Sequence, residues 1–304
     1  MSAAPETSTI HFRVDSGRAQ RERIRALAHA AADRQLHILD LGYRLASPAF
    51  DMSEVAVWET DSGDLAAFAA WQPAFKMLDY GVDARCDTTR FADAMIEWID
   101  DSFGDRAKAN GRTTCWIKIA PAHRDWPALF ERRGFERCAW SLAHLEHALG
   151  RFDRPELPAG FSIREVAGDS EADACAALHR AVFPRVAMTA EWRRRIMCDP
   201  WYRRDLDLVV VAPGGELAAC CLGWIDALGT RRGGQIEPLG THPDFRRQRL
   251  AQAVLREVVR RMADDGAGRV FVEAWDDNPG ALRTYESVGF RTAFHIRTYA
   301  KHFS

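Results

Sequence analysis

The chain has 304 residues, of which 47% are hydrophobic, 10% aromatic and 28% charged. This length suits one large or two ordinary domains, and the composition excludes the disordered and fibrous classes. The formal net charge of −2 argues against attraction of the whole molecule to nucleic acid or to an anionic membrane, so neither is expected as a partner.

The cysteines and the first residues indicate a cytoplasmic protein. Seven cysteines are scattered without a C-x-x-C pair, and we expect reduced, mostly buried thiols. Residues 1–9 carry no apolar stretch of the kind found in export signals. No apolar run approaches the ~18 residues that a membrane span needs. We therefore expect a soluble protein that is not exported.

Two short motifs recur at about half the chain length. Residues 63–67 (GDLAA) correspond to residues 215–219 (GELAA), 152 positions later. Residues 130–135 (FERRGF) correspond to residues 285–290 (YESVGF), 155 positions later. Because the matches keep their order and nearly their spacing, the sequence predicts a tandem duplication.

Each copy has the pattern of the mixed α/β (α+β) class, with a central mixed β-sheet flanked by helices. The Pro- and Gly-containing segment 150–160 suits a linker, so we expect domains at residues 1–150 and 158–304. In the first copy, apolar residues between Phe91 and Ile99 predict a helix. In the second copy the expected elements are, in chain order, a strand at 161–165, helices at 172–183 and 190–197, a hairpin of 206–212 and 217–225, a strand at 235–241, a helix at 250–262, a strand at 270–275, a helix at 279–287 and strands over 290–299.

The segment 242–249 joins an expected strand to an expected helix and is strongly basic. Eight arginines stand against three acidic residues between positions 231 and 261. A loop that enters a helix N-terminus presents unpaired amides and the positive end of the helix dipole, which suits an anion such as phosphate. A solvated helix face is the alternative interpretation of the same charges.

Two motifs of the second copy resemble the signatures of the GNAT acyltransferase superfamily. The first is Leu239-x-Thr241-x-Pro243-x-x-Arg246-x-x-Arg249-x-Ala251, and the second is Asn278-x-x-Ala281-x-x-x-Tyr285-x-x-x-Gly289-Phe290. The resemblance covers the chain from about residue 161 to its end and implies two tandem GNAT-like domains, acetyl-CoA as acyl donor and no metal. It implies coenzyme A contacts from Leu239, Gly240, Thr241, Arg246, Arg247, Gln248, Arg249, Leu250, Ala251, Asn278, Ala281 and Tyr285.

The resemblance also assigns these residues to parts of the cofactor. Residues 239–241 would pair with the pantetheine arm, the amides of residues 246–251 would hold the pyrophosphate, and Asn278 and Tyr285 would lie near the sulfur. Arg249 departs from the family pattern, which has glycine there. Glycine would let the backbone approach the phosphate, so the arginine either adds charge to the site or crowds it.

The first copy keeps the order of elements but lacks the site residues. Its loop at residues 83–91 carries acids where phosphate would bind. Phe130 and His123 stand where the second copy has Tyr285 and Asn278. We therefore expect a structural or substrate-shaping domain, a layout similar to that of tandem family members with a degenerate N-terminal copy.

Glu237 and Tyr285 are the candidate catalytic residues. An amine with a pKa of ~10.4 is protonated at pH 7, so a base must take its proton. Period-2 alternation places Glu237 on one strand face with Gln235, Leu239 and Thr241, and in the family this face supplies the base. Tyr285 is protonated at pH 7 and would supply a proton to the departing thiolate. The alternatives are an ion pair to an arginine for Glu237 and core packing for Tyr285.

Other residues are candidates for the acceptor pocket or for the core. His144 and His147 have no third ligand in view, so we expect them at the surface and expect no metal site. Trp71 and Trp224 fall in repeated strands and are expected in the core. Four side chains could line a pocket for the acceptor: Trp192, Trp201, Tyr202 and Gln235.

The expected reaction is the transfer of an acetyl group from acetyl-CoA to a primary amine of a small molecule, by direct attack on the thioester. A non-catalytic acyl-CoA-binding sensor is the alternative from another class, and Arg249 motivates it. Nucleic-acid binding through the arginines is a third alternative, against which the overall charge argues. The sequence does not indicate the acceptor, the acyl chain length or the oligomeric state.

Overall fold

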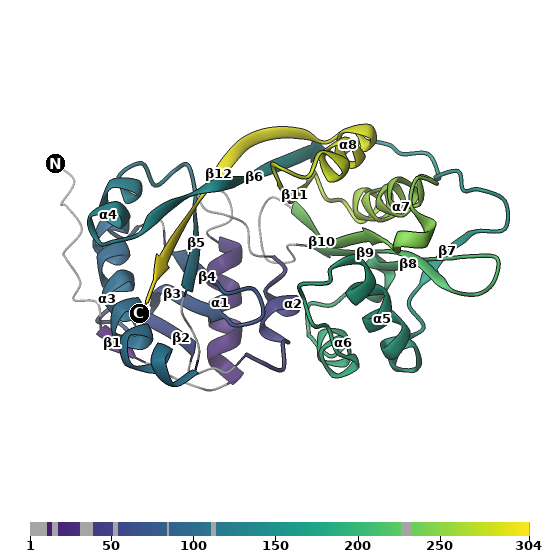
Figure 1. Cartoon of the computed structure of the whole chain (residues 1–304). Helices are drawn as coiled ribbons and strands as arrows, with labels where there is room; N and C mark the ends of the chain where they lie inside the picture. Colours follow the sequence, from purple (N-terminus) through teal and green to yellow (C-terminus); the bar gives the residue numbers. More distant parts are fainter. Residues whose placement is uncertain are drawn as a thin grey trace. The chain divides into compact units, whose positions relative to one another are not determined.

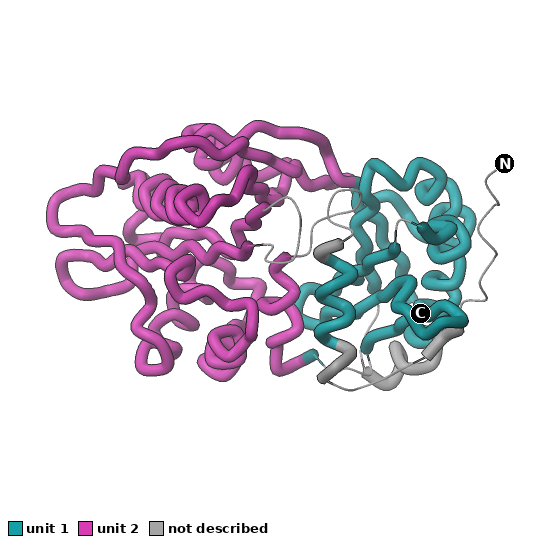
Figure 2. Tube along the Cα trace, turned by 180° about the vertical axis from the view of Figure 1, so that it is seen from behind, with its two compact units in different colours: residues 1–38, 50–138, 297–304 teal, residues 39–49, 139–296 magenta. Residues whose placement is uncertain are grey.

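The structure is a computed structural model that describes residues 11–13, 18–30, 39–50, 54–83, 85–110, 114–225 and 233–303. The chain forms two compact units, shown in different colours in Figure 2. Unit 1 comprises residues 1–38, 50–138 and 297–304, and unit 2 comprises residues 39–49 and 139–296. Within the described ranges, none of the helices has the length and hydropathy that a membrane crossing requires.

The two units differ from two contiguous halves. Segment 39–49 belongs to unit 2, and segment 297–304 belongs to unit 1. Strand pairing explains why segment 297–304 belongs to unit 1, because residues 297–302 pair antiparallel with residues 114–119. The strand that ends the first copy instead pairs through residues 142–148 with residues 269–275. The domain boundaries expected from the repeat stay a prediction.

Unit 1 contains a mixed sheet in the order β1-β2-β3-β4-β5-β12, in which β4 and β5 run parallel. Helix α3 packs its apolar stripe against this sheet, with Phe91, Met95, Ile96 and Ile99 all buried, so the predicted helix is confirmed. The elements are β1 (His11–Arg13), α1 (Arg18–Ala30), β2 (Val55–Glu59), β3 (Leu65–Gln72), β4 (Met77–Val82), α3 (Thr88–Asn110), β5 (Thr114–Ile119), α4 (Trp126–Arg132) and the end of β12 (Arg291–His302).

Unit 2 contains a sheet in the order β6-β11-β10-β9-β8-β7, in which β10 and β11 run parallel. Helices α7 and α8 cover one face and α5 and α6 the other (Figure 1). The elements predicted for the second copy are confirmed at nearly the expected bounds, except that its end is one long strand. The elements of unit 2, of which α2 and β6 were not predicted, are α2 (Leu41–Leu45), β6 (Glu136–Ala148), β7 (Ser162–Glu165), α5 (Ala172–Val182), α6 (Ala190–Met197), β8 (Asp207–Val211), β9 (Leu217–Ile225), β10 (Gly233–Thr241), α7 (Leu250–Asp264), β11 (Arg269–Trp275), α8 (Pro279–Val288) and β12.

The repeated motifs fold alike in the two units. Gly63 and Gly215 occupy equivalent hairpin turns, with φ of 82° and 94°. Gly134 and Gly289 follow α4 and α8, with φ of 84° and 109°. An L side chain is strained at such angles, which explains why glycine recurs at these positions. The shared local geometry supports the tandem repeat seen in the sequence.

The burial of some side chains differs from expectation. Trp71 and Trp224 are both 2% exposed, so their core positions are confirmed. His144 is 1% exposed, and the prediction that it lies at the surface is wrong, because its ring stacks between Phe271 and Phe294. The cysteines are free, and three are buried, three partly buried and one exposed, so the expectation of mostly buried thiols is also wrong; the three buried ones are Cys115, Cys175 and Cys221.

Candidate active site

Strands β10 and β11 pair only where they begin. The parallel ladder joins residues 233–235 to residues 269–271 and then ends. Along its other edge, β10 pairs with β9 as far as Thr241. In the part of the chain that the structure describes, residues 239–241 therefore have no strand partner on the β11 side. Their backbone groups on that edge can pair with an extended ligand.

A β-bulge interrupts β10 next to this open edge. The register with β9 shifts between Ile236 and Leu239, and both side chains pack in the same apolar cluster. An uninterrupted strand would point residues three positions apart to opposite faces. The prediction that Gln235, Glu237, Leu239 and Thr241 share one face is therefore wrong. Glu237 stands within the bulge itself.

The start of α7 presents a run of amides without acceptors. Among the described residues, none accepts a hydrogen bond from the N–H groups of residues 247–252. The first helical bond is donated by the amide of Ala253 to the carbonyl of Arg249, at 3.0 Å. Arg247 and Arg249 have φ of 65° and 59°. Left-handed residues beside a helix start form concavities of backbone N–H groups that bind anions.

Helix α3 of unit 1 begins in a different way. Oδ1 of Asp87 accepts hydrogen bonds from the amides of Thr89 and Arg90, at 3.0 and 3.1 Å. Its carbonyl accepts the first helical bond from Phe91, so Asp87 holds the position at α3 that Arg249 holds at α7. One helix start is closed by its own carboxylate, while the other is open to an external anion.

The arginines around α7 differ in their partners, and Arg256 donates a hydrogen bond to the carbonyl of Ser287 at 3.5 Å. Arg260 and Arg261 form ion pairs with Glu257, at 2.8 and 3.0 Å, and belong to a neutralised helix face. Positions 231 and 232 lie outside the described residues. Three exposed arginines of the loop make no ion pair with any described residue: Arg246, Arg247 and Arg249. Positive charge thus remains next to the open amides.

Glu237 and Tyr285 lie in one electrostatic neighbourhood. Tyr285 is 7% exposed, and no described residue hydrogen-bonds its hydroxyl. Burial, followed by the charges of Glu237 and Cys221, raises the pKa of Tyr285 well above its ordinary value. The phenol therefore keeps its proton at neutral pH. Glu237 is half-buried, and its backbone carbonyl accepts a hydrogen bond from Nε1 of Trp224 at 2.8 Å.

The remaining residues of the two motifs stand at helix starts. Asn278 caps α8, where its Oδ1 accepts a hydrogen bond from the amide of Ala281 at 3.1 Å. Leu250 is 1% exposed and packs in the core, so it can reach a ligand only through its backbone. Gln248 and Ala251 are half-buried. Among the described residues, no group of three His, Cys, Asp or Glu side chains could hold a metal ion.

Two of the predicted acceptor residues tie segment 39–49 to the rest of unit 2. Trp192 is 2% exposed, and its Nε1 donates to the carbonyl of Tyr43 at 2.9 Å. Oε1 of Gln235 accepts from the amides of Leu39 and Asp40, at 2.9 and 3.2 Å. Both side chains are thus engaged in packing the chain. Their role toward an acceptor stays a prediction.

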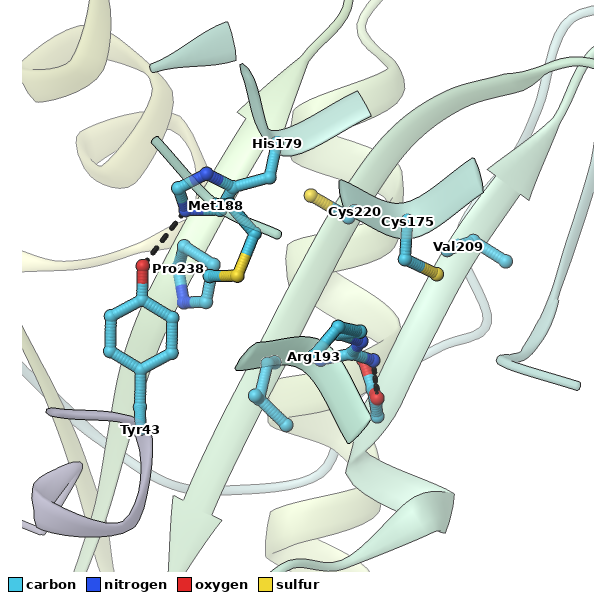
Figure 3. A pocket seen from close by; sticks show the side chains of 10 residues that line it. Tyr43, Cys175, His179, Met188, Arg193, Val209, Cys220 and Pro238 are labelled. Carbon is cyan, nitrogen blue, oxygen red and sulfur yellow. Dashed lines mark hydrogen bonds and ion pairs between the residues drawn. The ribbon is translucent and has the colours of Figure 1, made fainter. Parts of the chain in front are cut away.

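A narrow pocket lies among α2, α5, α6 and strands β8 to β10 (Figure 3). Its lining includes Tyr43 and His179, which are hydrogen-bonded at 2.8 Å. None of the four predicted acceptor residues lines it, although Tyr202 donates to the lining residue Asp207 at 2.7 Å. Sequence analysis missed Tyr43, because it belongs by position to the first copy and follows no motif.

Comparison with known proteins agrees with this geometry. Residues 172–290 match the family described as the acetyltransferase (GNAT) family. This stretch of unit 2 is therefore similar to the GNAT family. It is 29% identical over 188 residues to the mycothiol acetyltransferase of Kineococcus radiotolerans. That match covers 59% of this chain and 60% of the length of the relative.

Solved structures extend the GNAT likeness to the whole chain. A GCN5-related N-acetyltransferase from Sphaerobacter thermophilus is 19% identical with a TM-score of 0.69, over 96% of this chain and 95% of the other. A tandem GNAT protein from the clavulanic acid biosynthesis pathway is 16% identical with a TM-score of 0.64, over 97% and 98%. The predicted fold class and tandem GNAT layout are confirmed.

Proposed function

We propose that this protein transfers an acetyl group from acetyl-CoA to a primary amine of a small molecule, in a site on unit 2. The observation that carries the proposal is the run of amides from residue 247 to residue 252, for which no described residue is an acceptor, next to three arginines that form no ion pair with any described residue. The matching helix start in unit 1 is closed by Asp87. An open helix start with local positive charge fits the pyrophosphate of coenzyme A.

The open edge of β10 supports the second half of cofactor binding. Backbone groups of residues 239–241 would pair with the amides of the pantetheine arm. Asn278 and Tyr285, at the start and within α8, would lie near the sulfur. When bound, the thioester supplies an activated acetyl group whose leaving thiol has a pKa near ~8.5.

Glu237 and Tyr285 would then handle the two protons of the reaction. Glu237 would take a proton from the ammonium form of the acceptor, directly or through water, since the neutral amine is the nucleophile. Tyr285, held protonated by its buried position, would give a proton to the departing sulfur, and the attacking nitrogen would release its surplus proton to the resulting phenolate or to water. The half-buried position of Glu237 at the bulge is compatible with access by a solvent-borne acceptor.

Unit 1 is proposed to have a structural or substrate-shaping role. Phe130 is fully buried and has no hydroxyl to act in place of Tyr285. His123 is 7% exposed, and its ring stacks on that of Trp126, with 4.0 Å between the two ring centroids. These residues serve the aromatic core of unit 1.

The name of the Kineococcus radiotolerans relative supports a small molecule as acceptor.

Two measurements test the proposal. Calorimetric titration with acetyl-CoA should give saturable one-site binding, and binding should be lost when Arg246, Arg247 and Arg249 are together replaced by Ala. A panel of small amines, followed by release of free coenzyme A, should contain at least one substrate. Tight binding of acetyl-CoA without thiol release across the panel would favour a sensor of acyl-CoA. Absence of acetyl-CoA binding would refute both the acetyltransferase and the sensor.

A further inference from the structure

The pocket behind β10 contains polar atoms that no described residue satisfies. His179 and Arg193 are 6% and 7% exposed, and both line the pocket. The Nδ1 atom of His179 and the Nε atom of Arg193 are buried without a hydrogen-bond partner. Buried polar atoms in this condition cost free energy unless a water or a ligand group pairs with them. A polar group bound in the pocket that pairs with these atoms would remove this cost.

The neighbouring groups determine the charge and the hydrogen-bonding character of that occupant. Arg193 is ion-paired with Asp207, so the pocket carries no net charge from this pair. The Nε–H of Arg193 can only donate. Burial, with the charges of Arg193 and Arg180, lowers the pKa of His179 to about 4, so its ring is neutral at pH 7 and can donate or accept. A hydroxyl, which both accepts and donates, matches these two atoms.

The size of the pocket limits the occupant to a small group. The cavity has a volume of about 30 Å³, enough for about two water molecules or for one carbon and one oxygen. Its apolar wall includes Met188, Leu222 and Pro238, which suits a methylene group. Pro238 directly follows Glu237 in the sequence. Burial, followed by the charge of Glu237, raises the pKa of Tyr43. The pocket is thus next to the proposed base.

We propose that this pocket binds a hydroxymethyl group of the amine acceptor, with Tyr43 and His179 as specificity-determining residues. Tyr43 holds the imidazole through the hydrogen bond to Nε2 (Figure 3), which leaves Nδ1 to pair with the ligand hydroxyl. Its segment belongs by sequence to the first copy and by structure to unit 2. The assignment to the acceptor rests on the proposed function, whereas binding to the pocket can be measured without turnover.

A matched pair of amines tests the proposal. 2-Amino-1,3-propanediol and 2-aminopropane share one carbon skeleton and one amine, and differ only in two hydroxyls. Protein with labelled histidines and saturated with coenzyme A is titrated with each amine, and the His179 ring signals are assigned from a His179→Gln spectrum. We expect the diol to shift these signals with a Kd at least tenfold below that of 2-aminopropane.

Variants separate the pocket from the rest of the molecule. Tyr43→Phe, which keeps the ring, should abolish the preference for the diol, and Val209→Ile, which fills space in the wall, should do the same. Tyr299→Phe, in unit 1, is the matched control and should keep the preference. Equal Kd values for the two amines in the wild type, or His179 signals that stay unmoved, would mean that the pocket holds only water and would overturn the proposal.

A separate measurement distinguishes this inference from the proposed function. The affinity for acetyl-CoA, determined by calorimetry, should be the same in Tyr43→Phe and in the wild type. If the wild type does not bind acetyl-CoA, the proposed function is refuted. The diol titration without cofactor would still test the pocket. A wild type that binds acetyl-CoA but shows no preference for the diol would refute only the pocket assignment.

Discussion

At the scale of single residues, Arg249 shows why the family pattern has glycine at this position. Its φ of 59° lies in the left-handed region, where a Cβ costs of order 1 kcal/mol. The departure seen in the sequence is therefore a strained residue in an otherwise conventional helix start. Strain of this kind persists where the side chain or the backbone geometry serves a ligand.

Substitutions of Arg249 separate the effect of charge from that of strain. Arg249→Ala keeps the strain and removes the side chain, so acetyl-CoA should bind roughly ten- to a hundredfold more weakly if a charge-assisted hydrogen bond of ~1.5–3 kcal/mol is lost. Arg249→Gly should weaken binding similarly but unfold with a free energy about 1 kcal/mol higher than the Ala variant. Calorimetry and urea unfolding give the two numbers. Tighter binding by the Gly variant would mean that the arginine obstructs the site.

Tyr285→Phe tests the proposed role of Tyr285 as the general acid that protonates the departing sulfur. The change removes the hydroxyl and keeps the buried ring, so acetyl-CoA affinity should stay within about twofold while kcat falls roughly ten- to a hundredfold, at the low end of general acid effects because the thiol leaves readily. Steady-state rates and calorimetry on the same preparation provide the comparison. Unchanged kcat from pH 6 to pH 9 would assign Tyr285 to the core alone.

Glu237→Gln tests the base. The amide cannot take a proton, so kcat/KM should fall by roughly a hundredfold or more, and the acidic limb of its pH profile should disappear. The loss should be smaller at high pH, where more of the acceptor is already the neutral amine. A profile that keeps its acidic limb would place the base elsewhere.

At the scale of elements, the two equivalent helices differ in how their first amides are satisfied. Asp87→Ala should remove the cap of α3 and lower the unfolding free energy of unit 1 by about 1 kcal/mol. Because the phosphate-binding role is assigned to α7, affinity for acetyl-CoA should not change. Urea unfolding and calorimetry check the two parts, and a second acetyl-CoA site in the Asp87→Ala variant would contradict the assignment of unit 1.

The elements also show what the sequence could predict. Helix α7 was predictable because its apolar residues repeat at helical spacing, and the hairpin of β8 and β9 because glycine marks its turn. The bulge in β10 was not predictable, since period-2 alternation assumes a regular strand. The assumption led to the wrong prediction that Glu237 and Leu239 share one strand face. The closed start of α3 was anticipated only as acids in the loop, without the hydrogen bonds that Asp87 makes.

At the scale of the whole molecule, each unit has an apolar core of its own with polar groups buried in it. Unit 1 uses aromatic side chains such as Trp126 and Phe130 to fill the volume beneath α4. Unit 2 also buries polar groups, among them His179 and Gln235. The exchange of segment 39–49 into unit 2 escaped sequence analysis, because it depends on contacts between residues nearly 200 positions apart.

Each unit also buries a histidine whose ionisation opposes folding. Burial lowers the pKa of His123 in unit 1 and of His179 in unit 2 to about 4. Between that value and the ordinary ~6.5 the unfolded chain binds more protons than the folded chain. Their stabilising effect is therefore complete above pH 6.5 and is lost as the pH falls toward 4, by up to about 1.4 kcal/mol per pH unit for each histidine.

Urea unfolding at pH 7 and pH 5 measures this linkage. The wild type should lose unfolding free energy between the two values, and the loss should shrink in His123→Gln and in His179→Gln, because glutamine does not titrate. His302→Gln is the matched control, since His302 is exposed and its removal should leave the pH dependence unchanged. If the two buried variants lose as much stability as the wild type, other groups carry the pH dependence, and the neutral state assigned to the His179 ring in the pocket would need revision.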